Sequence, residues 1–217
     1  MATQLDICNL ALLRLGQGQI GAMTEQSQEA QYCLKFWDAD RKAALRDYAW
    51  NFATPDPTTL AQLPNTPVDF AYAYQLPADC LRALMIFNPI MLREGLLGVV
   101  DISDVSSAAF DNLAQQILAE LTFFKIRKNR VLVTNMEQAY LVYTADITDT
   151  SKYDDQFVEA LSYRLAIDLA LPITANPQFA STMTSLYRGS LLAARKSDAQ
   201  ERKTPTKIGR SFLQARQ

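Results

Sequence analysis

The order of structural patterns along the chain constrains its fold more than any single motif does. Two segments with helical spacing stand at each end, and a proline-rich middle separates them. Within that middle, short apolar and aromatic runs are interrupted by Pro55, Pro57, Pro64, Pro67 and Pro77, which is typical of strands rather than helices. We therefore predict an α+β protein, in which both chain ends form an antiparallel helical bundle and the middle is an inserted β-rich module.

Apolar spacing and capping residues predict two helices at the N-terminal end. Thr3 and Asp6 form a capping-box pattern before a helix of about 13 residues, which Gly16 ends. Thr24 is the expected N-cap of a second helix, which runs to about Tyr48. The expected buried face of this second helix comprises Ala30, Leu34, Trp37, Arg41, Leu45 and Tyr48.

Two further helices are predicted at the C-terminal end. Ser151 or Asp154 caps the first of them, and Pro172 is expected to close it or to lie just beyond its end. The second begins with Asn176 as its cap and Pro177 as its first residue, and it continues toward residue 203. Its expected apolar face comprises Phe179, Met183, Leu186, Leu191 and Ala194.

The middle of the chain predicts five strands. They are Phe70–Gln75, Leu81–Phe87, Thr122–Arg127, Val131–Thr134 and Ala139–Thr144. Asn129 and Arg130 are expected to form the hairpin turn between the third and the fourth. The stretch 101–116 fits a loop, and Asn112–Leu121 fits a short helix equally well.

These patterns divide the chain into three parts. Residues 1–50 and 151–203 are predicted to form the bundle, and residues 51–150 the β-rich domain. Residues 204–217 contain few apolar side chains, so they are predicted to form an extended docking tail that a partner orders.

Residue usage argues against an enzyme. The chain has no histidine, which excludes the usual serine and cysteine triads, and it contains no GxSxG, HExxH or GxxxxGK[ST] motif. Cys8, Cys33 and Cys80 lie far apart, which favours buried free thiols over a disulfide framework or a zinc site. We predict no catalytic residue, no cofactor and no metal.

One GxGxxG pattern requires an alternative explanation. Gly16, Gly18 and Gly21 match the dinucleotide-binding fingerprint, but that fingerprint follows a strand and opens a helix. Here a predicted helix precedes the first glycine. A helix C-terminus followed by a turn is therefore the favoured interpretation.

Two acidic pairs raise the possibility of a glycosidase-like site. Asp101 with Asp104, and Asp154 with Asp155, provide paired carboxylates, but nothing in the sequence fixes their separation. The second pair stands at a predicted helix start, where carboxylates stabilise the exposed amides, so helix capping is favoured there.

The apolar segments of the chain favour a protein without a membrane partner. Asp6 and Arg14 interrupt the first apolar stretch, so no secretory signal peptide is predicted. The most apolar region, Leu81–Val100, is broken by charged residues and a proline, so no membrane span is predicted there.

Charge is distributed unevenly between the body of the chain and its C-terminal end. Residues 1–187 contain 13 basic and 21 acidic side chains, a net charge of −8, whereas residues 188–217 contain 8 and 2, a net charge of +6. Apolar residues are interleaved with the basic ones, so charge can steer a partner and side-chain burial can hold it. We predict a docking arm with the contact residues Lys207, Ile208, Arg210, Phe212 and Leu213. A nucleic-acid-binding arm and an inert tail are the alternatives.

A second basic cluster lies in the β-rich module. It comprises Lys125, Arg127, Lys128 and Arg130, around the predicted hairpin and beside two phenylalanines. Such a cluster can contact phosphate or face the tail, although a solvated strand face is the favoured alternative.

Four segments carry a family resemblance. They are Ile7–Gly16 with the sequence ICNLALLRLG, Tyr48–Ala53 with YAWNFA, Tyr74–Arg82 with YQLPADCLR, and the predicted helix Phe157–Thr174. Together, and in this order, they resemble the tail tubular protein A family, the head-to-tail adaptors of short-tailed bacteriophages.

The resemblance implies a structural protein of the virion that is assembled in the host cytoplasm. It also implies that copies of the chain bind one another and form a ring of twelve between the portal protein and the tail tube or nozzle protein. Packaged double-stranded DNA would pass through the lumen, and an acidic body fits this role because it repels the phosphate backbone. The alternatives are a virion-associated cell-wall hydrolase and a nucleic-acid-binding module.

Overall fold

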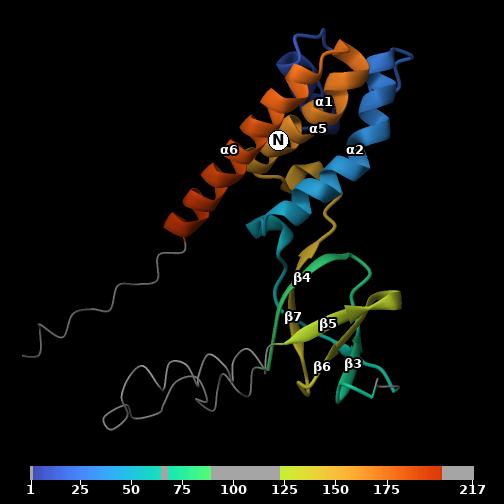
Figure 1. Ribbon diagram of the computed structural model, residues 1–217, viewed down its shortest axis with the longest axis vertical. Coiled ribbons are helices and arrows are strands. Elements are labelled where there is room, and N and C mark those ends of the chain that lie inside the picture. Colours follow the sequence, from blue (N-terminus) through green and yellow to red (C-terminus); the bar gives the residue numbers. More distant parts are fainter. Residues whose placement is uncertain (1, 65–67, 89–122, 202–217) are drawn as a thin grey trace, which may run out of the picture. The chain divides into compact units, whose positions relative to one another are not determined.

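A computed structural model describes residues 2–64, 68–88 and 123–201. These residues contain four α-helices and two antiparallel sheets, which confirms the predicted α+β class (Figure 1). The chain divides into two compact units. We call residues 1–44 and 149–217 the helical unit and residues 45–148 the β unit.

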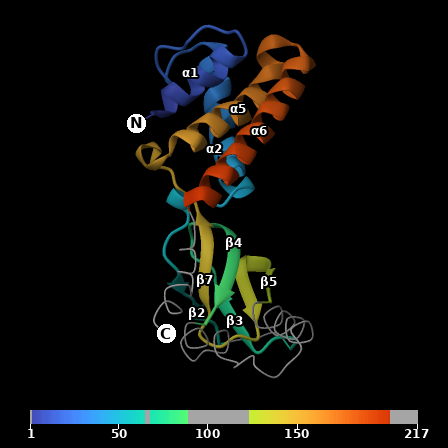
Figure 2. The same ribbon diagram turned by 90° about the vertical axis from the view of Figure 1, so that its left-hand side faces the viewer.

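The helical unit takes its helices from both ends of the chain. They are α1 (Gln4–Arg14), α2 (Gln28–Asp47), α5 (Asp155–Thr174) and α6 (Pro177–Glu201), although the last residues of α2 belong to the β unit. Helix α5 packs against both α1 and α6 (Figures 1 and 2). Segments more than 140 residues apart in the sequence therefore share one core, to which α1 and α5 both contribute fully buried side chains.

Three of the four predicted helix starts are confirmed. At α1, the Thr3 hydroxyl accepts from the Asp6 N–H and the Asp6 carboxylate accepts from the Thr3 N–H, which completes the capping box. Asp154 caps α5. At α6, the Asn176 side chain accepts from the Gln178 N–H at 2.9 Å.

The predicted start of α2 is wrong, whereas α5 ends at Thr174, as the predicted helix Phe157–Thr174 does. Helix α2 begins at Gln28, four residues after Thr24, and the Ser27 hydroxyl accepts from the Ala30 N–H. Pro172 lies inside the last turn of α5 instead of at or beyond its end. A proline in the last turn removes only one donor, and the left-handed Ala175 closes the helix by donating to the Leu171 carbonyl.

The predicted buried faces of α2 and α6 are partly wrong. Leu34 on α2 and Phe179 and Leu186 on α6 are exposed. The buried residues are Ala30, Cys33, Trp37, Asp40, Arg41, Ala44 and Leu45 on α2, and Met183, Tyr187 and Ala194 on α6. Leu34 and Leu186 follow helical spacing, but they lie beside the buried stripe rather than within it.

The β unit contains two small antiparallel sheets. In the first, the order is β1 (Thr58–Thr59), β7 (Tyr140–Ala145) and β4 (Cys80–Phe87). In the second, it is β2 (Ala61–Gln62), β3 (Tyr72–Gln75), β6 (Val131–Thr134) and β5 (Phe124–Arg127).

The five predicted strands are confirmed as β3, β4, β5, β6 and β7. Their observed ends differ from the predicted ends by at most two residues. The predicted hairpin between β5 and β6 is also confirmed, with Arg127 paired to Val131 across the turn. Asn129 and Arg130 both adopt positive φ angles there, 62° and 59°. The predicted loop at 101–116 and the alternative short helix at 112–121 lie outside the described residues.

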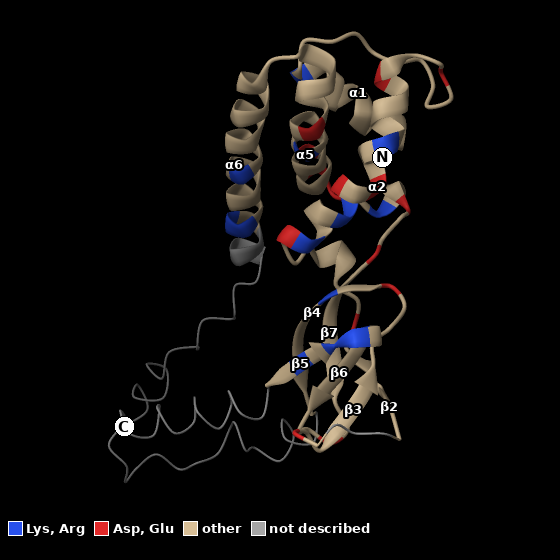
Figure 3. Cartoon of the chain, turned by 45° about the vertical axis from the view of Figure 1, so that its right-hand side comes forward, with Lys and Arg blue, Asp and Glu red and all other residues tan. Residues whose placement is uncertain are grey.

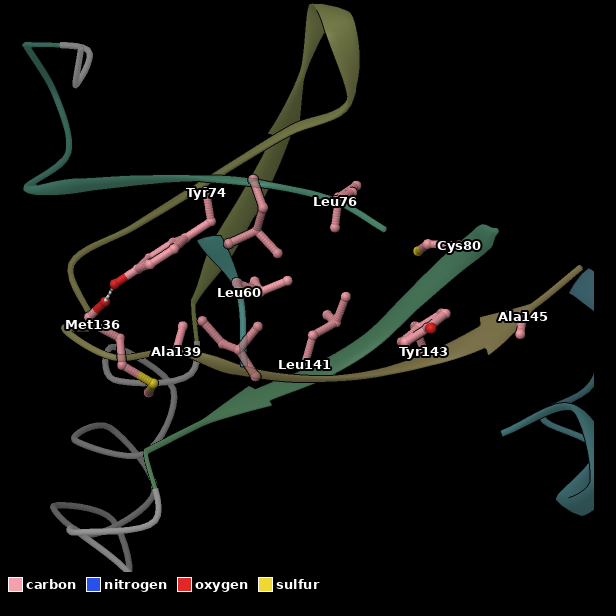
Figure 4. Close-up of a cluster of buried hydrophobic side chains, with 11 residues drawn as sticks. Leu60, Tyr74, Leu76, Cys80, Met136, Ala139, Leu141, Tyr143 and Ala145 are labelled. Carbon is pink, nitrogen blue, oxygen red and sulfur yellow. Dashed lines mark hydrogen bonds between the residues drawn. The ribbon is translucent and has the colours of Figure 1, made fainter. Parts of the chain in front are cut away.

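A single apolar cluster joins the two sheets (Figure 4). Leu60 is the one residue between β1 and β2, so the chain passes from the first sheet to the second at this point. Its side chain is in the cluster and its N–H donates to the Ala139 carbonyl. Tyr74 lies at one end of the cluster, where its buried hydroxyl donates to the Met136 carbonyl at 2.9 Å. This core fixes β5 and the turn that follows it, which carry the basic cluster.

Candidate interaction surfaces

The predicted basic cluster lies on β5 and the following turn. Lys125 and Arg127 alternate along β5 with Phe124, which packs against the core, and with Ile126. Lys125 and Lys128 are exposed. The structure therefore keeps these two ammonium groups accessible, whereas the two arginines of the cluster have partners within the β unit.

Arg127 is held by an acidic and an aromatic neighbour. Its guanidinium forms an ion pair with Asp69 and lies 5.9 Å from the centre of the Phe70 ring. Phe70 in turn stacks on Phe123, with ring centres 6.1 Å apart. The ion pair neutralises the charge of Arg127, which reduces its value as a phosphate contact.

Arg130 ties the hairpin turn to the connection between β3 and β4. Its guanidinium donates to the carbonyls of Pro77 and Cys80, each at 2.7 Å, and its own carbonyl accepts from the Leu76 N–H at 3.1 Å. All three contacts involve residues of the YQLPADCLR segment. We infer a structural role for Arg130, which sequence reasoning missed because the carbonyls that it binds lie about 50 residues earlier.

We expect Arg130→Lys to lower the free energy of unfolding of the β unit by about 1–2 kcal/mol, because one terminal guanidinium nitrogen donates to both carbonyls and the shorter lysine side chain does not place its ammonium at that position. Lys128→Ala removes a charge from the same turn and is expected to change stability by less than about 0.5 kcal/mol. Urea unfolding measures both. Equal stability of Arg130→Lys and the wild type would contradict the structural role.

A buried carboxylate lies between α2 and α5. Asp40 Oδ1 accepts from Arg164 Nε at 3.0 Å, while Asp40 Oδ2 has no hydrogen-bond partner. Asp168 Oδ2 lies 3.7 Å from a terminal nitrogen of Arg164. Burial, with the neighbouring Asp168, raises the pKa of Asp40 to about 7, although Arg164 opposes the shift. The pair joins the two chain ends, and sequence reasoning did not find it.

The thiols are all buried and free, as predicted. Cys8 on α1 and Cys33 on α2 are neighbours, and the Cys33 thiol together with burial raises the pKa of Cys8 well above its usual range. A protonated buried thiol is a poor nucleophile. Within residues 2–64, 68–88 and 123–201, no group of three His, Cys, Asp or Glu side chains is placed to hold a metal ion.

The two remaining sequence patterns have structural roles where they are described. Gly16 follows Leu15, the C-cap of α1, and has a φ of 73°, so the GxGxxG pattern begins at a helix end, as expected. Asp154 accepts from the Phe157 N–H as the cap of α5, and Asp155 lies in the first turn. Asp101 and Asp104 are outside the described residues.

The predicted docking residues are also outside the part that the structure describes; they are Lys207, Ile208, Arg210, Phe212 and Leu213. Among the helices that it does describe, none is both long and apolar enough to cross a bilayer. No protein-family model matches the chain, and no curated protein matches it.

Proposed function

We propose that this chain is a head-to-tail adaptor of a short-tailed bacteriophage. In this proposal its copies form a ring between the portal protein and the tail tube or nozzle protein, and packaged DNA passes through the lumen. Twelve copies is the number that the family resemblance implies. The protein acts by assembly and not by catalysis.

The discontinuous helical unit is the observation that carries the proposal. Helices from both chain ends share one core, and the β unit is inserted between them. The resemblance to tail tubular protein A implies this arrangement. In such a subunit the helical unit can contact neighbouring copies of the chain, while the inserted β unit can bind a different protein.

The proposal includes a finer description of the fold. The four helices act as an antiparallel bundle, and residues 204–217 form an extended tail that binds a cleft of the portal. In that tail, Lys207 and Arg210 steer docking by charge, while Ile208, Phe212 and Leu213 provide apolar contacts. The net charge of −8 over residues 1–187 supports sliding of DNA past the ring.

Deletion of residues 204–217 tests this function. We expect the truncated protein to fold, because the described cores of both units lie before residue 204, and to lose binding to portal rings. Co-sedimentation with portal rings from the same phage measures binding, and negative-stain images of the protein alone and with portal show whether rings form. Lys125→Ala/Lys128→Ala is the matched control, since it removes basic side chains outside the tail. Normal portal binding by the truncated protein would overturn the docking role.

A further inference from the structure

The outward side of α6 is an apolar surface that nothing in the described chain covers. Phe179, Leu186 and Leu192 are 36–55% exposed on it. Between them runs a row of small residues at four-residue spacing, namely Ser181, Ser185, Gly189 and Ala193. A Cβ built on Gly189 meets no atom within 4 Å. Small side chains in an i, i+4 row leave a groove that can receive the ridge of another helix. We call these seven residues the α6 face.

A second apolar surface lies on α1. Leu10 and Leu13 are 39% and 48% exposed, and helical spacing places them with Asp6 on the side opposite the buried residues of α1. Exposed Asp155 and Glu159 lie at the start of α5, and Arg14 reaches the Glu159 carbonyl from the end of α1. We call Asp6, Leu10, Leu13, Asp155 and Glu159 the α1 face.

The two faces lie on different sides of α5, which packs against both helices. Figure 3 shows α6 on one side of α5 and α1 on the other. One copy of the helical unit therefore presents one face to each of two neighbours. Such a heterologous contact closes a ring when the rotation between copies allows it.

Charge indicates which surfaces pair. Between residues 177 and 197, α6 carries Arg188, Arg195 and Lys196 and no acidic residue, as the blue bands in Figure 3 show. The α1 face carries three carboxylates, and the nearby Arg14 cation lies 3.3 Å from the centre of the Tyr163 ring on α5. The basic side chains beside the α6 face would repel those of a second α6, whereas they attract the carboxylates of the α1 face.

We infer that copies of this chain associate head to tail, with the α6 face of one copy against the α1 face of the next. Exposed leucines of α1 enter the row of small residues on α6, and the basic side chains of α6 meet the carboxylates of the α1 face. The inference rests on the proposed ring and names the lateral contact within it.

Two single variants and their mixture test this contact. Leu186→Asp places a carboxylate in the α6 face and leaves the α1 face unchanged. Leu10→Asp places one in the α1 face and leaves the α6 face unchanged. Each variant alone is expected to self-associate at least about tenfold more weakly than the wild type. Mixed one to one, they are expected to form heterodimers and no larger species, because each retains the face that the other lacks. Sedimentation velocity, alone and with portal rings, measures the species present.

The controls separate misfolding from loss of the contact. Leu171→Asp changes a leucine that is exposed on α5 but belongs to neither face, and it is expected to associate as the wild type does. Arg188→Glu/Arg195→Glu leaves the apolar residues intact and is expected to weaken association by charge alone. Circular dichroism of each variant establishes that it is folded.

Each outcome bears on one proposal or the other. Rings of normal stability from Leu186→Asp and Leu10→Asp would overturn the contact and leave the adaptor function standing. A wild-type protein that stays monomeric both alone and with portal would also overturn the contact. Association that these variants abolish, in a protein that never binds portal, would support the contact and overturn the adaptor function. If Arg188→Glu/Arg195→Glu loses binding to duplex DNA but keeps normal self-association, α6 binds nucleic acid and the contact is wrong.

Discussion

Replacing Arg164 with methionine is expected to lower the free energy of unfolding by about 2 kcal/mol at pH 8 and by about 1 kcal/mol at pH 5. Asp40 is buried, its Oδ1 accepts from Arg164 at 3.0 Å, and its Oδ2 has no hydrogen-bond partner. At pH 8 the wild-type Asp40 carboxylate is ionised beside Arg164, whereas in the variant the same buried group must either stay charged without that cation or take up a proton. At pH 5 that carboxyl group takes up a proton, so the cost is smaller.

The direction of this pH dependence follows from the raised pKa of Asp40. The pKa is about 7 in the folded protein, compared with a reference value of 3.8. Between these values the folded protein binds more protons than the unfolded chain, so Asp40 makes the free energy of unfolding fall as pH rises. The slope approaches 1.4 kcal/mol per pH unit at most, which amounts to about 3 kcal/mol between pH 5 and pH 8. Without Arg164 the pKa rises further and the loss extends to higher pH.

Two further variants isolate Asp40 from the other groups that titrate. Asp40→Asn removes the ionisable group, so its stability is expected to vary less than that of the wild type between pH 5 and pH 8. In Asp40→Asn/Arg164→Met the penalty of the arginine substitution at pH 8 is expected to shrink to about 1 kcal/mol, because no buried charge is left behind. Urea unfolding at pH 5, 6, 7 and 8 measures all four proteins. An Arg164→Met penalty that is equal at pH 5 and pH 8 would contradict this account.

The buried pair also shows why parts of the fold could not be predicted from the sequence. Local patterns predicted two helix caps and one turn, at Thr3, Asn176 and Asn129. Each of these depends on residues within three positions of one another. Arg164 lies 124 residues after Asp40. No local pattern shows that an acidic residue on α2 will face an arginine on α5.

The exposed leucines illustrate the same limit for helix faces. Spacing of three and four residues placed Leu34 and Leu186 on the buried sides of their helices, yet both are exposed. Whether a residue beside the stripe is buried depends on how closely a neighbouring helix packs there, which one helical pattern does not determine. Leu186 is therefore part of the exposed α6 face, the surface that we infer binds a neighbouring copy.

The basic cluster shows how a correct position can mislead about function. Lys125, Arg127, Lys128 and Arg130 do surround the predicted turn. The structure nevertheless gives Arg127 a carboxylate partner in Asp69 and gives Arg130 two carbonyls. Only the two lysines then suit a phosphate contact, which weakens the case for a strong DNA-binding site on the β unit.

Truncating a leucine in the core of α5 is expected to destabilise the helical unit by about 3 kcal/mol. Leu161 is fully buried in the unit that both chain ends form, so Leu161→Ala leaves a cavity there. Leu171→Ala is the matched control, because Leu171 lies on the same helix and is 61% exposed. It is expected to cost less than about 1 kcal/mol.

The two tryptophans of the chain allow this loss to be assigned to one unit. Trp37 is buried in the helical unit and Trp50 in the β unit, so fluorine NMR of protein labelled with 5-fluorotryptophan follows each unit separately during urea unfolding. The Trp37 resonance of Leu161→Ala is expected to lose its native position at lower urea than in Leu171→Ala. If both variants lose it at the same urea concentration, Leu161 is not part of a shared core. The two chain ends would then lack the common frame on which both the adaptor proposal and the lateral contact depend.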